Sequence, residues 1–96
     1  MTARDDAVEE LGRIRAEIEA IDATLVATVA RRVALARRVG ALKRVAELPT
    51  LDPPREAAVV RRAGALAREA GLDDEDIRYV FWQIIGMSRR AQLEER

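Results

Sequence analysis

A proline-free run from about Asp5 to Glu47 constrains this chain more than any other feature. Its apolar residues recur at alternating steps of three and four, which is the pattern of a heptad helix. One helix of roughly 43 residues would be about 64 Å long, whereas a compact domain of this chain length has a radius of gyration of about 12–13 Å. The rest of the chain cannot cover such a helix, so we expect a second copy to cover it in an obligate dimer. The apolar seam consists of Leu11, Ile14, Ile18, Ile21, Leu25, Leu35, Val39 and Leu42, and is interrupted by the polar residues Thr28 and Arg32.

A second stripe on the same run places three cations on an otherwise largely apolar face. Arg32 and Lys43 are eleven residues apart, about 16 Å of helical rise, so their long side chains can converge on one small ligand. Arg15 precedes Arg32 by seventeen residues, about 25 Å, which is too far to share that ligand within one chain. Arg15 would therefore serve a second site, most simply that of a dimer partner. The simpler alternative for any one arginine is a solvated residue beside the seam, because a buried cation is costly unless it is paired.

The composition excludes several classes of protein. The 96 residues carry 17 basic and 17 acidic side chains, and a net charge of zero argues against a protein that binds nucleic acid or membrane surfaces. The absence of cysteine and histidine excludes disulfides, thiol and imidazole chemistry and nearly every transition-metal site, so no metal or cofactor is expected. The acidic N-terminus lacks the apolar segment of a signal peptide, and no run approaches the ~20 apolar residues that span a bilayer. We therefore expect one cytoplasmic domain over residues 1–96, with a flexible tail over residues 1–4.

Two shorter helices are expected after the long one. Asp52 followed by two prolines is typical of a helix start, and this second helix should run to about Ala70, where Gly71 can end it. Asp73 is placed to cap a third helix, whose apolar face is extended by Ser88 and Gln92. The chain is thus predicted to be all-α, with one long helix and two shorter helices that form an intertwined helical homodimer.

Three residues of these helices are expected to have unusual surroundings. Gly12 and Gly40 each cost up to about 1 kcal/mol relative to alanine, so close packing is expected at one or both. Glu56 lies on the edge of the buried stripe of the second helix. Its carboxylate either interacts with the helix dipole, reaches out to solvent, or is partly buried with a raised pKa. Because the chain has no histidine, any activity that changes with pH near neutrality would depend on a carboxyl group with a perturbed pKa, and Glu56 is the first candidate.

Eight polar residues fall on apolar faces, and together they favour a site for a small dianion. Four are cations, two are carboxylates and two are neutral hydrogen-bonding residues, and none is a good nucleophile. Arginine forks match carboxylates, and a reaction without covalent intermediates can be accelerated by orientation and electrostatics. The eight are Arg15, Arg32, Lys43, Asp52, Arg55, Glu56, Ser88 and Gln92.

Four segments occur in a fixed order: RAEIEAID, RRVALARRVGALK, LDPPRE, and GLDDEDIRYVFWQII followed by the spacing x-x-S-x-x-x-Q. Together they closely resemble the all-helical chorismate mutases of the shikimate pathway, over the range from Leu11 to Gln92. The resemblance implies an isomerase that converts chorismate to prephenate by a Claisen rearrangement, for aromatic amino acid biosynthesis. It also implies an intertwined homodimer with two equivalent sites.

The same resemblance implies a role for each of the eight residues. Arg15 of one chain and Arg32 of the other hold the two carboxylates of the substrate. Lys43 and Gln92 hydrogen-bond the ether oxygen, which gains negative charge as the C–O bond breaks. Asp52 and Glu56 approach the ring hydroxyl of the substrate. Ser88 and Arg55 complete the carboxylate end of the site and the residues that surround it.

Three alternatives stay open. Isochorismate–pyruvate lyases of the same fold resemble the mutases but typically lack the acidic residue at the position of Glu56, so its presence favours the mutase. A mutase of secondary metabolism acting on 4-amino-4-deoxychorismate is not excluded, because two carboxylates near ring position four can accept an amine as readily as a hydroxyl. A helical dimerisation module without chemistry would carry apolar residues at the positions of Arg32 and Ser88, where this chain has polar ones.

Overall fold

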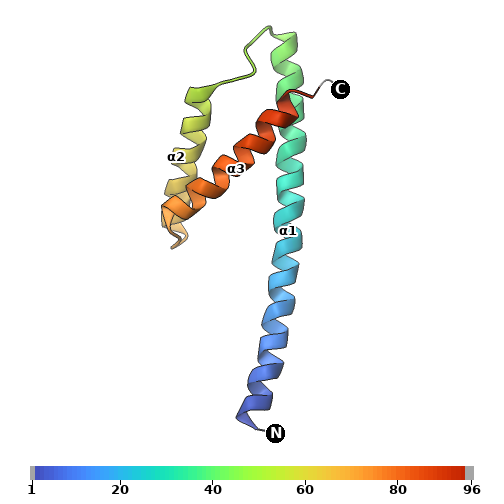
Figure 1. Cartoon of the computed structure of the whole chain (residues 1–96), viewed down its shortest axis with the longest axis vertical. Coiled ribbons are helices and arrows are strands. Elements are labelled where there is room, and N and C mark those ends of the chain that lie inside the picture. Colours follow the sequence, from blue (N-terminus) through green and yellow to red (C-terminus); the bar gives the residue numbers. More distant parts are fainter. Residues whose placement is uncertain (1, 95–96) are drawn as a thin grey trace. The chain divides into compact units, whose positions relative to one another are not determined.

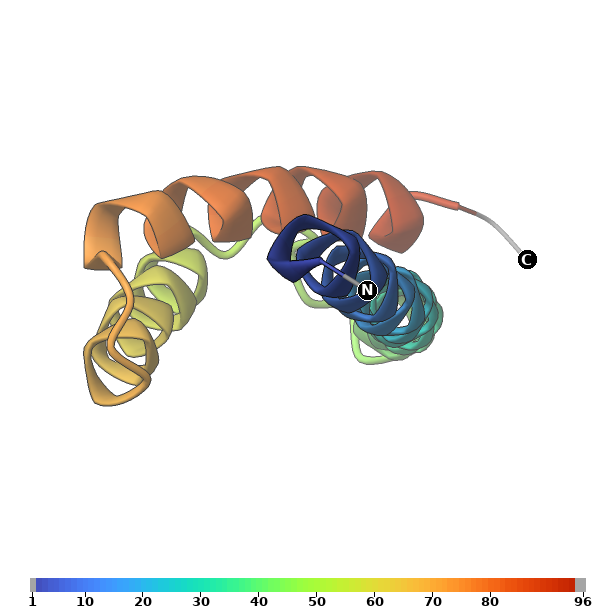
Figure 2. The same cartoon turned by 90° about the horizontal axis from the view of Figure 1, so that it is seen from below.

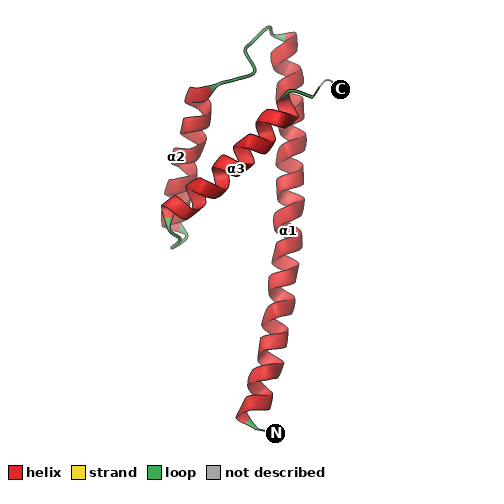
Figure 3. Ribbon diagram, in the orientation of Figure 1, coloured by secondary structure: helices red, strands yellow, loops and turns green. Residues whose placement is uncertain are grey.

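The computed structural model describes residues 2–94, and these residues form three helices and no strand (Figures 1 and 3). The helices are α1 (Ala3–Val45), α2 (Pro53–Glu69) and α3 (Asp74–Gln92). The predicted all-α class, with one long helix and two shorter ones, is therefore confirmed. The chain divides into two compact units, Met1–Arg31 and Arg32–Arg96, so the boundary between them falls inside α1. None of the described helices is apolar over enough of its length to pass through a bilayer.

The start of α1 is fixed by a reciprocal cap. The backbone N–H of Asp5 donates to Oγ1 of Thr2 at 3.1 Å, and the backbone N–H of Thr2 donates to Oδ2 of Asp5 at 3.2 Å. This exchange satisfies two of the N–H groups that a helix start leaves without partners. Residues 2–4, expected as part of a flexible tail, thus form the cap and first turn of α1. Met1 lies outside the described residues.

The heptad seam of α1 is open to solvent in the single chain. Its apolar residues are each between 41% and 64% exposed. A contiguous apolar stripe of this kind is rare on a monomer and marks an interaction surface. The buried core is small by comparison, since four of the six buried apolar residues are alanines: Ala36, Val60, Ala63, Ala67, Ile85 and Ala91.

The two ends of α2 follow the predicted local chemistry. The side chain of Asp52 accepts a hydrogen bond from the backbone N–H of Arg55, and Pro53 occupies the first helical position. At the other end, Gly71 has a φ of +76°, a conformation that glycine adopts at little cost. The N–H of Leu72 donates to the carbonyl of Ala67 at 2.8 Å, which completes a Schellman motif. The predicted boundaries of α2 are confirmed.

Helices α2 and α3 pack through small residues and form the core of the second unit. Figure 2 shows α3 from the side, with α2 beneath its N-terminal half. Asp73 caps α3 by accepting from the backbone N–H of Asp76 at 3.0 Å, as predicted. Leu66, which the sequence placed in the buried stripe of α2, is 44% exposed because it lines an open cavity. Ala70, placed in the same stripe, is also exposed.

Within the second unit, the last turn of α3 lies against the C-terminal part of α1 (Figure 1). A Cβ on Gly40 would lie 2.6 Å from Cα of Gln92 and 2.8 Å from its carbonyl carbon, and closer still to its carbonyl oxygen. Only glycine allows this approach, so the predicted close packing is confirmed at Gly40. At Gly12, a Cβ would meet nothing within 4 Å in the single chain.

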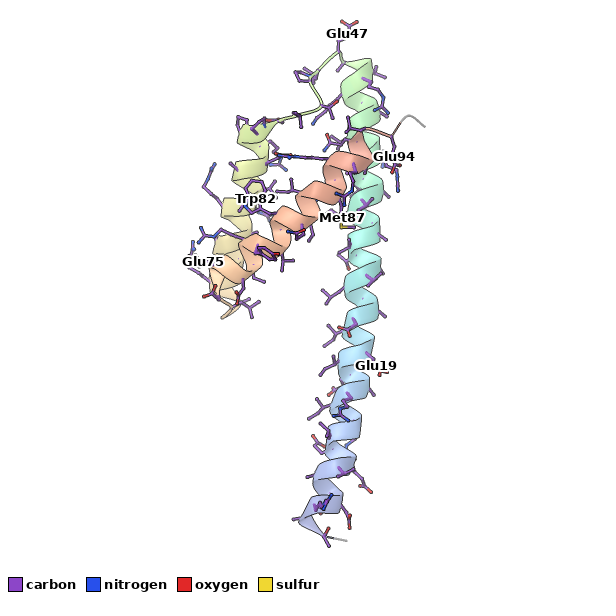
Figure 4. The ribbon with its side chains drawn as sticks, viewed as in Figure 1. Glu19, Glu47, Glu75, Trp82, Met87 and Glu94 are labelled. Carbon is purple, nitrogen blue, oxygen red and sulfur yellow. The ribbon has the colours of Figure 1, made fainter. Side chains whose placement is uncertain are left out.

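Two arginines of α1 hold the end of α3 in place. Arg44 donates from Nη1 to the carbonyl of Gln92 at 2.9 Å and from Nη2 to the carbonyl of Glu94 at 3.0 Å. The carbonyl of Gln92 belongs to the group that a helix end leaves without intrahelical partners, and Glu94 follows the C-cap residue Leu93. Glu94 lies beside α1 (Figure 4), where its Oε2 accepts from Nε of Arg37 at 2.5 Å. The position of Gln92 is thereby fixed by contacts on both its backbone and the residues that follow it.

Candidate active site

A cavity of about 300 Å³ lies among the three helices of the second unit. Its volume falls at the lower end of the range for small-molecule sites, about 300–1,000 Å³. Its walls combine apolar side chains from all three helices with a few polar ones, the usual composition of a ligand site. Five of the eight residues predicted from the sequence line this cavity: Arg32, Arg55, Glu56, Ser88 and Gln92.

Arg32 is held against α3 by Ser88. Nη1 of Arg32 donates to Oγ of Ser88 at 2.7 Å, and this hydroxyl donates in turn to the carbonyl of Ile84 at 3.1 Å. Ser88 is only 7% exposed, so a buried hydroxyl that is itself fixed by Ile84 orients the guanidinium. The arginine keeps four further N–H groups that can bind a carboxylate.

Lys43 is joined to the cavity through Gln92. Its Nζ donates to Oε1 of Gln92 at 2.7 Å and to the carbonyl of Thr50 at 2.8 Å. An ammonium group has three N–H donors, so one remains for a ligand. Because Oε1 of Gln92 accepts from Lys43, the amide nitrogen of Gln92 is the group that can donate to a ligand. The structure therefore brings together the two residues that were expected to share one acceptor.

Glu56 is bound at both carboxylate oxygens by a residue that the sequence did not suggest. Nε of Arg89 donates to Oε2 at 2.7 Å, and Nη2 donates to Oε1 at 2.5 Å. The side chain of Glu56 is 14% exposed and that of Arg89 is 47% exposed. This bidentate pair joins the first turn of α2 to the last third of α3.

The ion pair decides the protonation state of Glu56. Hydrogen bonds from Arg89 hold the pKa of the Glu56 carboxyl below its ordinary value of 4.5, against the opposing effect of burial, and the charges of Arg89 and Lys43 lower it further. Of the three alternatives considered for Glu56, partial burial with a raised pKa is therefore wrong. The reason is that the cation compensating the carboxylate comes from another helix, 33 residues away in sequence.

The other predicted residues stand in different relations to the cavity. Arg55 lines it but is exposed. Asp52 is exposed, serves as the N-cap of α2, and does not line the cavity. Arg15 lies on α1 in the first unit, where it is exposed. The predicted role of Arg15 in the site of a partner stays a prediction.

A second cavity of about 280 Å³ adjoins the first, and Arg32, Arg55 and Val59 line both. Arg62 adds a third guanidinium to the second cavity, beside Leu66. Three arginines around one space favour an anionic occupant. The second cavity is therefore lined by positive charge, as the first one is.

The charges of the site suit a small dianion and chemistry without covalent intermediates. Arg32 and Arg55 line the main cavity and Lys43 adjoins it, whereas the carboxylate of Glu56 is already paired with Arg89. Over residues 2–94, no group of three aspartate, glutamate, histidine or cysteine residues could hold a metal ion. The arrangement can bind carboxylates and direct N–H donors at an oxygen that gains negative charge.

Two features of the site were not predicted from the sequence. Arg89 follows Ser88 directly, and the packing of α3 against α2 brings it within hydrogen-bonding distance of Glu56. Thr50 contributes a backbone carbonyl, for which residue identity gives no indication. A signal for Arg89 could have been its place one residue after Ser88 on a helix already expected to reach the site.

The sequence model of the family described as chorismate mutase type II matches residues 14–93 of this chain. The match spans all three helices and includes each of the eight residues discussed above. It agrees with the resemblance drawn from the four sequence segments.

Two curated proteins similar to this chain are both named 4-amino-4-deoxychorismate mutase. The protein from Streptomyces venezuelae is 42% identical over 65 residues, which cover 68% of this chain and 63% of that protein. The protein from Streptomyces pristinaespiralis is 32% identical over 88 residues, which cover 92% of this chain and 68% of that protein. This chain therefore spans slightly less than two thirds of the first relative and slightly more than two thirds of the second.

Proposed function

Because this chain belongs to the chorismate mutase type II family, we propose that it converts chorismate to prephenate in the cavity of its second unit. The observation that carries the proposal is the pairing of Lys43 with Gln92 beside a cavity that also presents Arg32. Two N–H donors and a carboxylate-binding fork thus meet around one space without any nucleophile. A rearrangement of a dicarboxylate enol ether needs these groups: cations that bind the carboxylates and N–H donors that stabilise the ether oxygen.

Binding begins with the carboxylates. Arg32, oriented by Ser88, offers a fork for one of them. Arg55 adds positive charge to the same wall. We assign the second carboxylate to Arg15 of a partner chain. Within one chain, the helical spacing predicted from the sequence puts Arg15 too far from Arg32 for both to bind the same ligand.

The chemical step is concerted. The ether C–O bond breaks while a C–C bond forms between the enolpyruvyl side chain and the ring, and no proton is transferred. The protein has to hold the reacting carbons within contact distance, which the apolar walls formed by Val39, Val59 and Ile85 can do by confining the substrate.

Beyond confinement, catalysis comes from hydrogen-bond donors to the ether oxygen of the substrate, which gains negative charge in the transition state. The third N–H of Lys43 and the amide N–H of Gln92 are the donors that we assign to it. Both interactions are stronger in the transition state than in the bound substrate, so they accelerate the step instead of only tightening binding. Glu56 is ionised and can accept a hydrogen bond from the ring hydroxyl.

We further propose that the active form is a homodimer. The exposed apolar seam of α1 needs a covering partner, because the chain's own buried core is small and does not cover it. The charges support the same arrangement. Residues 1–31 carry four basic and seven acidic side chains, whereas residues 32–96 carry thirteen basic and ten acidic ones. The first unit of one copy is thus negative and the second unit of another is positive, although the whole chain is neutral.

A second candidate substrate is 4-amino-4-deoxychorismate, because both curated relatives are named as mutases of that compound. The reaction would be the same rearrangement, with an amino group in place of the ring hydroxyl. An isochorismate–pyruvate lyase is the less favoured alternative, since Glu56 lines the cavity and typical lyases lack this acid.

Incubation of the purified protein with chorismate tests the proposal. We expect chorismate absorbance to fall, a product of unchanged mass to appear, and acid to convert this product to phenylpyruvate. The Arg32→Ala variant serves as a control that ties the activity to the cavity. Unchanged chorismate would refute the proposed activity, and release of pyruvate from isochorismate would instead identify a lyase.

A further inference from the structure

Arg89, which forms a bidentate pair with Glu56, has no assigned role in the reaction proposed above. Glu56 is the only carboxylate among residues 2–94 that lines the main cavity. Arg89 engages both of its oxygens, at 2.7 and 2.5 Å. The one anionic side chain that could select a cation on the substrate is therefore already paired with a cation of the protein.

We propose that Arg89 is a specificity-determining residue, which makes the cavity prefer a hydroxyl over an ammonium group at ring position four of the substrate. The inference rests on the proposed function, in which Glu56 faces that ring position. It names the substrate class within that function, chorismate rather than its 4-amino counterpart.

The preference follows from the charges and from the lone pairs of the carboxylate. Each carboxylate oxygen has two lone pairs, and Arg89 uses one on each oxygen. A neutral hydroxyl can donate to a remaining lone pair and is indifferent to the guanidinium. An ammonium group can donate there as well, but it is then repelled by the guanidinium that lies against the same carboxylate.

The other charged groups around Glu56 act in the same direction. Lys43 and Arg32 face it from α1, Arg55 neighbours it on α2, and Arg89 binds it from α3. All four are cations. With Glu56 neutralised by Arg89, nothing on the described wall of the cavity attracts a positively charged substituent.

The geometry of Arg89 also fixes the plane of the carboxylate. A guanidinium fork constrains both oxygens at once, whereas a lysine at this position would act as a point charge. The side chain of Glu56 is 14% exposed, so the fixed carboxylate lies at the inner end of the pair and the guanidinium at the solvent side. Arg89 thus acts on the substrate through Glu56, as a positioning residue.

The test compares kcat/KM for chorismate and for 4-amino-4-deoxychorismate in the wild type and in Arg89→Gln. We expect the wild type to prefer chorismate. Arg89→Gln should move the ratio of the two values toward the amino substrate by about three- to tenfold, the scale of one charge interaction at a partly exposed site. Arg89→Lys keeps the positive charge but loses the bidentate geometry. Because the preference arises from the charge, its ratio should stay within about twofold of the wild-type ratio.

Two controls separate charge at Glu56 from a general effect on α3. Arg90→Gln removes the neighbouring exposed arginine and should leave the ratio unchanged. Arg89→Gln introduced into a Glu56→Gln background should also leave it nearly unchanged, because the carboxylate that Arg89 neutralises is then absent.

A pH profile gives an independent reading. Arg89 lowers the pKa of Glu56, so Arg89→Gln should raise that pKa and move the acid limb of kcat/KM for chorismate to higher pH. A purely structural defect would lower the profile without moving it.

The outcomes distinguish the two claims. A wild type that rearranges neither compound refutes the proposed function and the inference together. If the wild type is active but prefers the amino substrate, or if Arg89→Gln leaves the ratio where Arg90→Gln leaves it, the specificity role of Arg89 is refuted and the mutase function stands.

Discussion

Gly40→Ala should weaken both the fold and the reaction, because the two depend on the same contact. The new Cβ would lie 2.6 Å from Cα of Gln92 and 2.8 Å from its carbonyl carbon. Both atoms belong to the backbone, so relief requires the last turn of α3 to move. Overpacking of this kind costs about 1–3 kcal/mol, and alanine returns about 1 kcal/mol through its better helix propensity. We expect a net loss of up to about 2 kcal/mol.

The displacement also reaches the chemistry. Gln92 holds the ammonium of Lys43 at 2.7 Å, and a shift of about 1 Å in a catalytic group can cost about a hundredfold in rate. We therefore expect kcat to fall about 10- to 100-fold in Gly40→Ala. The free energy of unfolding is measured by urea denaturation at fixed protein concentration, since stability of a dimer depends on concentration. Chorismate turnover is measured on the same preparation.

Gly86→Ala is the matched control. It makes the same change within α3, where the new Cβ would meet only Nη1 of Arg90, at 3.6 Å. This variant should be as stable as the wild type or more stable, by up to about 1 kcal/mol. If Gly40→Ala behaved like Gly86→Ala in both assays, the close approach of α3 to α1 would not be a requirement of the active fold.

Three further predictions concern assembly and pH. Sedimentation at low protein concentration should give twice the chain mass, and a compact active monomer would contradict the dimer. Mixing the Arg15→Ala and Arg32→Ala chains should restore about a quarter of the wild-type activity. Half of the randomly formed dimers contain one chain of each kind, and each mixed dimer has one intact site out of two. Mixed dimers as inactive as both parents would rule out Arg15 acting in trans. The pKa of Glu56 is lowered in the fold, so kcat/KM should be flat near neutral pH. The rate and the stability that depend on the Glu56–Arg89 pair should be lost only as the pH falls below 4.5, the ordinary pKa, and through the lowered pKa of the folded state. A transition of Glu56 near neutral pH would contradict this sign.

The elements of the fold could be predicted because their signals are local. Asp52 and Asp73 each accept from a backbone N–H three residues on, and Gly71 adopts the positive φ that ends α2. Each of these contacts lies within a few residues of sequence, where helix-capping chemistry is specific. The exposure of Leu66 was not predicted, because it depends on how far the neighbouring elements cover α2.

The candidate site could be predicted only in part. Helical spacing had placed Arg32, Ser88, Lys43 and Gln92 on apolar faces, so their convergence on one site was expected from the pattern. That Lys43 and Gln92 act together was expected only from the family resemblance. Arg89 was not expected to reach Glu56, because that contact depends on the crossing of two helices rather than on spacing within one. Of the alternatives considered for Glu56, partial burial with a raised pKa was wrong for the same reason, because the pattern showed the burial but not the compensating cation.

The most direct test of the account is a comparison of kcat for chorismate, measured at saturating substrate, between the wild type and Lys43→Ala. Lys43 is proposed to donate to the ether oxygen only as that oxygen gains charge. Loss of one such donor costs about 2.7–4 kcal/mol, so the rate constant should fall about 100- to 1,000-fold while KM changes little. Arg32→Ala, which removes a contact present in both states, should act mainly on KM. A Lys43→Ala protein that rearranges chorismate within a few-fold of the wild-type rate would show that the charge on the ether oxygen is stabilised elsewhere, and would contradict the proposed site.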